Sequence, residues 1–167
     1  MATLLRFTCI AAFACLMTSC VTSTPTAQTN AAGVTGSGTR HHKVRTTAYT
    51  HDEGSGGRNA IGRRLACGGV KSAASDWSRF PLGTRFRVLT TGQEYIIDDY
   101  GGALIGTNTI DLYKTSRKAM NQWGVRHVDI EVLQWGSPEE SLKVLRPRRG
   151  TRIVRRMIAG LESNKTI

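Results

Sequence analysis

Residues 98–113 read Asp-Asp-Tyr-Gly-Gly-Ala-Leu-Ile-Gly-Thr-Asn-Thr-Ile-Asp-Leu-Tyr. The acids of this stretch stand beside glycines or within a short β-branched and aromatic run, and not along the face of a helix. Upstream, Asp76 precedes the turn signal Pro81-Leu82-Gly83-Thr84 in a similar way. Acids are scarce in the chain, which has 12 Asp and Glu against 23 Lys and Arg. We therefore expect these acids at the ends of short strands.

Short β signals surround this stretch on both sides. Strand-forming residues and period-two alternation predict strands at residues 44–50, 69–74, 85–90, 94–97 and 126–133. One helix is expected between them, with Thr115 or Ser116 as its cap and Gly124 as its end. Many short strands with one helix predict a mainly β fold, a small barrel and not a layered α/β sheet.

The three acids Asp76, Asp99 and Asp111 have two interpretations. A glycine next to an acid lets a sugar ring approach the backbone closely, and carboxylates gathered in one cleft are what cleavage of a glycosidic bond requires. One carboxyl must then stay protonated, and a neighbouring negative charge helps to raise its pKa. The alternative is that an Asp beside a Gly only makes the hydrogen bonds of a turn. For any one of these acids alone, both interpretations stand.

Several motifs occur here in a fixed order. They are Thr47-Ala48-Tyr49-Thr50, the glycine-rich segment up to Leu65, Asp76 with Phe80-Pro81-Leu82-Gly83-Thr84, Asp99-Tyr100-Gly101-Gly102-Ala103-Leu104-Ile105-Gly106, Ile110-Asp111-Leu112-Tyr113 and Trp123-Gly124. This series resembles the "3D" (three-aspartate) domain, which also forms the catalytic part of membrane-bound lytic transglycosylase A. The resemblance covers about residues 45–133. It implies a small six-stranded double-psi β-barrel with one or two short helices, which we place at residues 42–135.

The resemblance implies an enzyme that cleaves the glycan strands of peptidoglycan, a lytic transglycosylase or a related glycosidase. By position, Asp111 is implied as the catalytic acid, Asp99 as the group that tunes the pKa of Asp111, and Asp76 as a supporting catalytic residue. The implied substrate contacts are Tyr49, Thr50, Gly101 and Gly102. The second domain of the transglycosylase has no counterpart in this chain, so the alternative is a non-catalytic module that binds peptidoglycan in the same groove.

The chain departs from the family pattern at several places. The segment 58–62, Arg-Asn-Ala-Ile-Gly, stands where Thr-Ala-x-Gly is usual, Tyr100 replaces a small residue, and Ile105 replaces a lysine. None of these changes removes an acid. Rare lipoprotein A is a related barrel, but its histidine before the proline turn is here Trp77, which makes that subfamily less similar.

Residues 1–20 have the pattern of a lipoprotein signal peptide. The apolar run 7–17 is shorter than the about 20 residues of a membrane span. It ends in a lipobox-like motif, so we expect Cys20 to be acylated; the alternative is a plain secretory peptide with an incidental cysteine. Residues 21–41, rich in Thr, Ser, Ala and Gly, are expected to form a flexible tether. Since Val21 is not aspartate, we expect a periplasmic protein that a lipid anchors to the outer membrane.

The formal net charge of +11 favours an anionic partner, which could be nucleic acid, lipid headgroups or a wall polymer. Because the signal peptide predicts secretion, membrane lipids and wall polymers are the favoured partners, and no nucleic-acid partner is expected. No cofactor and no metal are expected either, because the four histidines lack ligand spacing. Cys67 would be the one cysteine of the mature domain, and we expect it to be a small buried packing residue.

Residues 136–167 are expected to be a basic helical extension. Ser137-Pro138-Glu139-Glu140 is a strong helix start. A second helix would place Ile153, Val154, Met157, Ile158 and Leu161 on one face, flanked by arginines. Three interpretations are open: a helix docked on the barrel, a helix lying on anionic lipid or wall polymer, and a nucleic-acid contact.

Overall fold

The computed structural model describes residues 38–53 and 56–164. The predicted signal peptide, Cys20 and most of the predicted tether lie outside the described residues, so they stay predictions. Within the described part, no helix combines the length and the apolar character that crossing a membrane would need.

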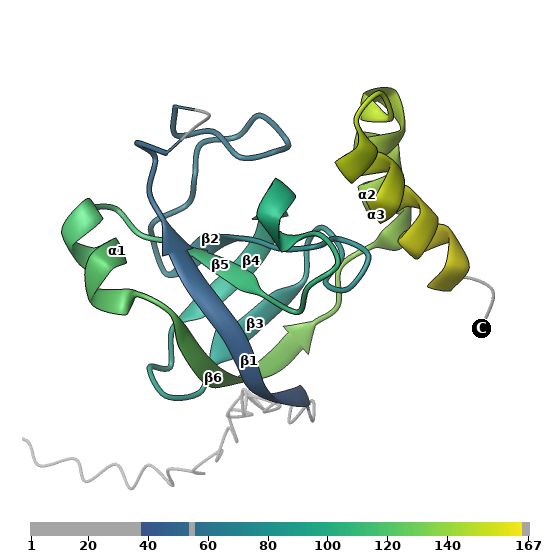
Figure 1. Ribbon diagram of the computed structural model, residues 1–167. Coiled ribbons are helices and arrows are strands. Elements are labelled where there is room, and N and C mark those ends of the chain that lie inside the picture. The colour runs from purple at the N-terminus through teal and green to yellow at the C-terminus, as the bar shows by residue number, and fades with distance from the viewer. Residues whose placement is uncertain (1–37, 54–55, 165–167) are drawn as a thin grey trace, which may run out of the picture. The chain divides into compact units, whose positions relative to one another are not determined.

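Six strands close into one barrel (Figure 1). In chain order they are β1 (Thr39–Tyr49), β2 (Val70–Ala74), β3 (Arg85–Val88), β4 (Glu94–Asp99), β5 (Ile110–Tyr113) and β6 (Arg126–Gln134). Around the barrel the order is β1-β5-β2-β4-β3-β6, with β1–β5 and β2–β4 parallel and the other pairs antiparallel. The predicted mainly β class and closed barrel are confirmed, and the mixed parallel and antiparallel order is that of a small double-psi barrel.

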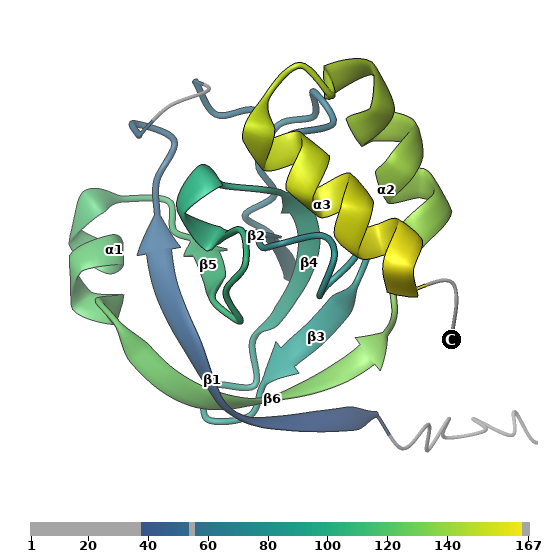
Figure 2. The ribbon, with the colours of Figure 1, turned by 45° about the vertical axis from the view of Figure 1, so that its right-hand side comes forward.

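Three α-helices and two 3-10 turns complete the described residues. They are η1 (Gly102–Leu104), α1 (Arg117–Trp123), α2 (Pro138–Leu145), η2 (Arg146–Arg148) and α3 (Arg152–Ser163). As predicted, Ser116 caps α1, because its side chain accepts a hydrogen bond from the Ala119 N–H, and Gly124 ends the helix at a φ of +58°. Figures 1 and 2 place α1 on one side of the barrel and the α2–α3 pair on the other.

Alternating side chains fill the barrel interior. Phe86 and Val88 of β3 and Ile130 of β6 have no exposed surface, and the Phe86 ring stacks on Tyr95 of β4 with centroids 5.6 Å apart. Each such side chain contributes about 1.5–3 kcal/mol through burial. The period-two pattern that predicted β3 and β6 therefore corresponds to inward and outward faces.

One strand starts earlier than predicted, and β5 was not among the strand ranges that the local pattern predicted. β1 begins at Thr39 and not at residue 44, because its first residues pair with β6 on the far side of a bulge between His41 and Val44. β5 has only four residues and too little sequence to show alternation; it forms because it pairs with β1 on one side and β2 on the other.

The α2–α3 pair packs against the barrel domain. Leu142 and Leu145 of α2 and Val154, Met157 and Leu161 of α3 are buried in one cluster with the barrel core. Gly160 lets α3 approach closely, since a Cβ there would lie 2.6 Å from the Ser78 Cβ. This packing is what the docked-helix interpretation predicts. The flanking arginines stay exposed, and Ile153 is 38 % exposed.

Candidate active site

Four residues from four adjacent strands form one row across the barrel wall. Strand pairing sets Thr47 opposite Asp111, Asp111 opposite Ala74, and Ala74 opposite Asp99. Directly paired residues project to the same face of a sheet. The two aspartates therefore flank Ala74, two strand spacings or about 10 Å apart at their Cα atoms. The small Ala74 side chain leaves the space between them open.

A bulge in β4 brings Asp99 into this row. Ala73 pairs with Ile97, but the next residue, Ala74, pairs with Asp99, so Asp98 is the extra residue on β4. A bulge redirects the side chains that follow it. Asp98 is buried, and its Oδ2 accepts hydrogen bonds from Ser72 Oγ at 2.7 Å and Asn59 Nδ2 at 2.8 Å. Asp98 is thus buried and hydrogen-bonded within the barrel domain, whereas Asp99 lies in the row beside Ala74.

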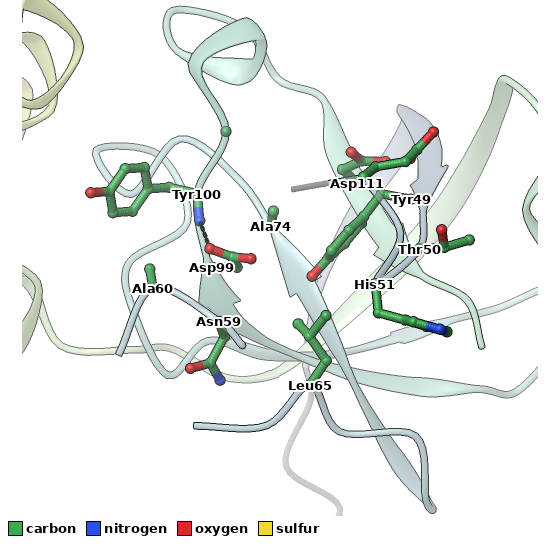
Figure 3. A pocket seen from close by; sticks show the side chains of 12 residues that line it. Tyr49, Thr50, His51, Asn59, Ala60, Leu65, Ala74, Asp99, Tyr100 and Asp111 are labelled. Carbon is green, nitrogen blue, oxygen red and sulfur yellow. Dashed lines mark hydrogen bonds between the residues drawn. The ribbon is translucent and has the colours of Figure 1, made fainter. Parts of the chain in front are cut away.

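The row opens into a cleft of about 470 Å³. In Figure 3, Ala74 lies between Asp99 and Tyr100 on one side and Asp111 and Tyr49 on the other. The cleft is lined by Tyr49, Thr50, His51, Glu53, Asn59, Ala60, Leu65, Ala74, Asp99, Tyr100, Gly101 and Asp111. Three carboxyl groups, those of Glu53, Asp99 and Asp111, thus line one cleft of the barrel domain.

The Asp99 carboxyl holds a proton unusually well. Burial is the main cause that raises its pKa to about 6, and the charges of Asp98 and Asp111 add to it. Hydrogen bonds from the backbone N–H groups of Tyr100, 2.9 Å from Oδ1, and of Ala60 act in the opposite direction. Asp99 consequently changes charge just below neutral pH.

Burial also raises the pKa of Asp111. The charge of Glu53 adds to this effect. The Thr47 hydroxyl opposes it by donating a hydrogen bond of 2.6 Å to Asp111 Oδ1, as does the charge of Arg45. Thr47 thereby fixes one carboxyl oxygen and leaves Oδ2 available to a ligand.

Tyr49 adds an unpaired donor to the cleft. Its Oη is buried and has no hydrogen-bond partner among the described residues. Burial, followed by the charges of Asp99 and Asp98, raises its pKa, so the hydroxyl keeps its proton at every working pH. A buried polar group without a partner is costly, so the Tyr49 hydroxyl is an unfavourable feature beside the cleft.

Of the other implied substrate contacts, two line the cleft and one does not. Thr50 and Gly101 line the cleft. Thr50 is buried, and its Oγ1 accepts a hydrogen bond from the Asp52 N–H at 3.2 Å, so it also shapes the turn after β1. Gly102 is absent from the lining. It lies against α3, where a Cβ would meet Ile153 Cδ1 at 2.9 Å, so its small size serves helix docking.

Asp76 is not brought together with the other two aspartates. Its Oδ1 accepts hydrogen bonds from the Ser78 N–H at 2.9 Å and from Ser78 Oγ at 2.7 Å, and its Oδ2 accepts one from the Gly106 N–H at 2.7 Å. The residue is buried and does not line the cleft. Here the structure matches the turn interpretation, since Asp76 joins two loops.

The sequence analysis missed several residues that shape the cleft. Asn59 lines the cleft and bonds to Asp98, and Thr47 holds Asp111. The pair Asp98-Asp99 was a usable signal, because two adjacent acids at a strand end suggest a bulge or an unusual pKa. Asn59 lies in the segment that departs from the family pattern, so no motif pointed to it.

The C-terminal segment supports the rim of the cleft. Arg148 Nη1 donates a hydrogen bond of 2.7 Å to the carbonyl oxygen of Ala60, and the Ala60 N–H in turn donates a hydrogen bond to Asp99.

Cys67 is exposed, so the prediction of a buried packing residue is wrong. It lies at an isolated bridge to Lys71, before Gly68 and Gly69. The described residues contain no cluster of His, Cys, Asp and Glu suited to a metal ion.

Comparison with known proteins agrees with this architecture. Residues 71–134 match the family model of the 3D domain, a family that is related to the catalytic domain of membrane-bound lytic transglycosylase A and is associated with proteins acting on peptidoglycan. The match spans the strands that carry Asp99 and Asp111. No curated protein gives a significant match to the chain.

Proposed function

Because the chain carries a 3D domain, we propose that it is a lytic transglycosylase that cleaves the glycan strands of peptidoglycan. The observation that supports this most is the row of Thr47, Asp111, Ala74 and Asp99 in one cleft, with the pKa of both carboxyls raised. Glycoside cleavage needs one carboxyl that is protonated when substrate binds.

In this proposal Asp111 is the acid and then the base. Its Oδ2 donates a proton to the oxygen that links muramoyl C1 to the next sugar, and the C1–O bond breaks. The resulting Asp111 carboxylate then takes the proton of the muramoyl 6-hydroxyl while that oxygen bonds to C1. The product is a 1,6-anhydro ring, Asp111 regains its proton, and no water or other reactant is consumed.

Asp99 and Tyr49 assist in this scheme. With a pKa of about 6, Asp99 is largely ionised at neutral pH, so its negative charge stabilises the positive charge that develops at C1. The Tyr49 side chain forms part of the cleft wall that the sugar contacts. Asp76 acts indirectly, because it holds the loop of residues 101–109 through the Gly106 N–H.

The location that we propose follows from the N-terminal pattern. Acylation of Cys20 would anchor the protein to the outer membrane, and the tether would let the domain reach peptidoglycan in the periplasm. Labelling with a radioactive or clickable fatty acid, compared between the protein and Cys20→Ala, tests this part. Label retained by the variant would refute it.

Digestion of purified peptidoglycan, with products identified by mass spectrometry, tests the activity. We expect anhydromuropeptides from the protein and none from Asp111→Asn. The control is Glu140→Gln, which removes an exposed acid of α2 and leaves the cleft intact. Products one water heavier would keep the site but make the enzyme a hydrolase. No cleavage, with peptidoglycan pulled down equally by both proteins, would make the domain a binding module.

A further inference from the structure

A second cleft, of about 540 Å³, lies beside the start of β1. Its lining is strongly basic, and none of the described residues that line it is an acid. The basic residues are Arg40, His41, His42, Lys43 and Arg79. Such a lining attracts a ligand that carries negative charge.

One wall of this cleft is aromatic. The Trp135 ring stacks on Phe80 with centroids 6.1 Å apart and an interplanar angle of 10°, and His41 stands edge-on to both at 5.8 Å. Trp135 is 46 % exposed, whereas Trp77 and Trp123 are buried. A rigid, partly exposed aromatic face beside polar groups suits a ring with one apolar face and polar edges, such as a sugar.

The backbone beneath the basic residues is held in an unfavourable conformation. Lys43 has a φ of +51° at the bulge between His41 and Val44. Asp129 stabilises this turn, since its Oδ1 accepts the Lys43 N–H at 2.9 Å and its Oδ2 contacts His42 Nδ1 at 3.0 Å. A positive φ in a non-glycine residue is unfavourable and tends to occur at functional sites. The Arg40 side chain makes no ion pair with an acid among the described residues, whereas the Lys43 charge interacts with Asp129 without forming a close ion pair.

The second cleft is connected to the first through the loop that carries Gly101 at one end and Asn108 at the other. Gly101 lines the first cleft, and Asn108 lines the second, where its Oδ1 accepts a hydrogen bond from Arg79. Asp76 ties this loop to Ser78, another residue of the second cleft. The two clefts thus lie on either side of one braced loop.

We propose that the second cleft binds a sugar unit that carries a negatively charged group. Trp135 contacts the ring, and Arg40, Lys43 and Arg79 bind the anion. The choice of a sugar rests on the proposed function, whereas the preference for an anion rests on the lining alone. The charge could be the lactyl carboxylate of a muramoyl unit without its peptide, or the phosphate of a phosphorylated sugar.

Titration with small sugars tests this. N-acetylmuramic acid differs from N-acetylglucosamine only by the lactyl ether with its carboxylate, and N-acetylglucosamine 6-phosphate represents the phosphate source. Binding is measured by the change in tryptophan fluorescence. Of the three tryptophans, Trp135 is the exposed one, so its emission should respond most to a bound ligand. We expect one anionic sugar to bind at least tenfold more tightly than the neutral sugar, and added salt to weaken that binding. Equal binding of all three sugars, or none, overturns the proposal, and the tighter anion identifies the source.

Three variants locate the binding. Arg79→Gln and Lys43→Asn should each weaken binding at least fivefold; asparagine is chosen because it tolerates a positive φ. Lys118→Gln removes the same charge from exposed α1 and should bind normally. Far-ultraviolet circular dichroism and thermal midpoints confirm that each variant is folded. If Lys118→Gln weakens binding as much as the other two, the effect is one of net charge and the site is refuted.

The outcome separates this inference from the proposed function. Asp111→Asn should bind the anionic sugar as the unaltered protein does, because Asp111 belongs to the first cleft. Sugar binding without peptidoglycan cleavage refutes only the transglycosylase. Cleavage without saturable sugar binding refutes only the second cleft.

Discussion

Asp76 and the pair of Asp99 and Asp111 belong to one barrel domain, but their carboxyl groups have very different surroundings. Asp76 accepts three hydrogen bonds, two from Ser78 and one from Gly106. Asp99 and Asp111 each accept fewer hydrogen bonds than Asp76, line an open cleft, and have a raised pKa. Asp76 therefore stabilises the fold as an acceptor of three hydrogen bonds. The other two can gain and lose protons because the fold leaves them incompletely satisfied.

This comparison predicts opposite effects of removing each charge. The largest effect is expected for Asp111→Asn. Loss of the acid should reduce peptidoglycan cleavage by roughly 10²–10⁴-fold. The free energy of unfolding at neutral pH should stay equal or increase, because burial disfavours the ionised form of Asp111 and asparagine cannot ionise. Anhydromuropeptide release and urea denaturation measure the two quantities. Normal cleavage by this variant would exclude Asp111 from the mechanism, and the proposed difference in role between Asp111 and Asp76 would be refuted.

Asp76→Ala should show the reverse pattern. Three donors lose a charged acceptor, so we expect the free energy of unfolding to fall by about 2–4 kcal/mol. Urea denaturation of this variant beside Asp111→Asn makes the comparison direct. At a temperature where the variant is fully folded, cleavage should fall by much less than for Asp111→Asn. An unchanged urea midpoint would show that the Asp76 hydrogen bonds add little to stability.

Asp99→Asn should change how stability depends on pH. A carboxyl whose pKa is raised on folding, here from 3.8 to about 6, binds its proton more tightly in the folded state. Its contribution is fully present below about pH 4 and is lost as the pH rises through about 6. The difference in free energy of unfolding between the variant and the parent should therefore shift in favour of the variant between pH 4 and pH 7. We expect this shift to be about 1–2 kcal/mol, because the carboxyl is partly solvated. Denaturation curves at both pH values decide this, and parallel pH dependence of the two proteins would contradict the raised pKa.

Thr47→Val should have the smallest effect. Valine keeps the shape but removes the hydrogen bond that favours the Asp111 carboxylate, so the pKa of Asp111 should rise further. The limb of the pH–rate profile that reports loss of the acid proton should shift to higher pH, with less than about a tenfold change in rate at pH 7. A profile with unaltered limbs would mean that Thr47 does not control the proton.

The α2–α3 pair bears on how one domain can make the site. Arg148 bonds to Ala60 at the rim, Ile153 packs on Gly102, and Gly160 lies against Ser78. These contacts reach three of the segments that carry cleft-lining residues. We interpret the C-terminal segment as a brace that holds these segments in place.

Local signals were sufficient for much of this protein. The alternation in β3 and β6, the serine caps of α1 and α2, and the position of acids at strand ends are all written in short stretches of sequence. They depend on neighbours within a few residues, so propensity and side-chain spacing determine them. The family motifs then indicated which barrel these elements form.

Only the tertiary structure decided which aspartates lie in the same cleft. The row depends on the pairing of β1, β5, β2 and β4, which are far apart in sequence, and on the Asp98 bulge, which a one-residue change of register would undo. Asp76 found its acceptor role through Gly106, 30 residues away. Burial then set the pKa of each carboxyl, and burial is a property of the folded chain that no local pattern contains.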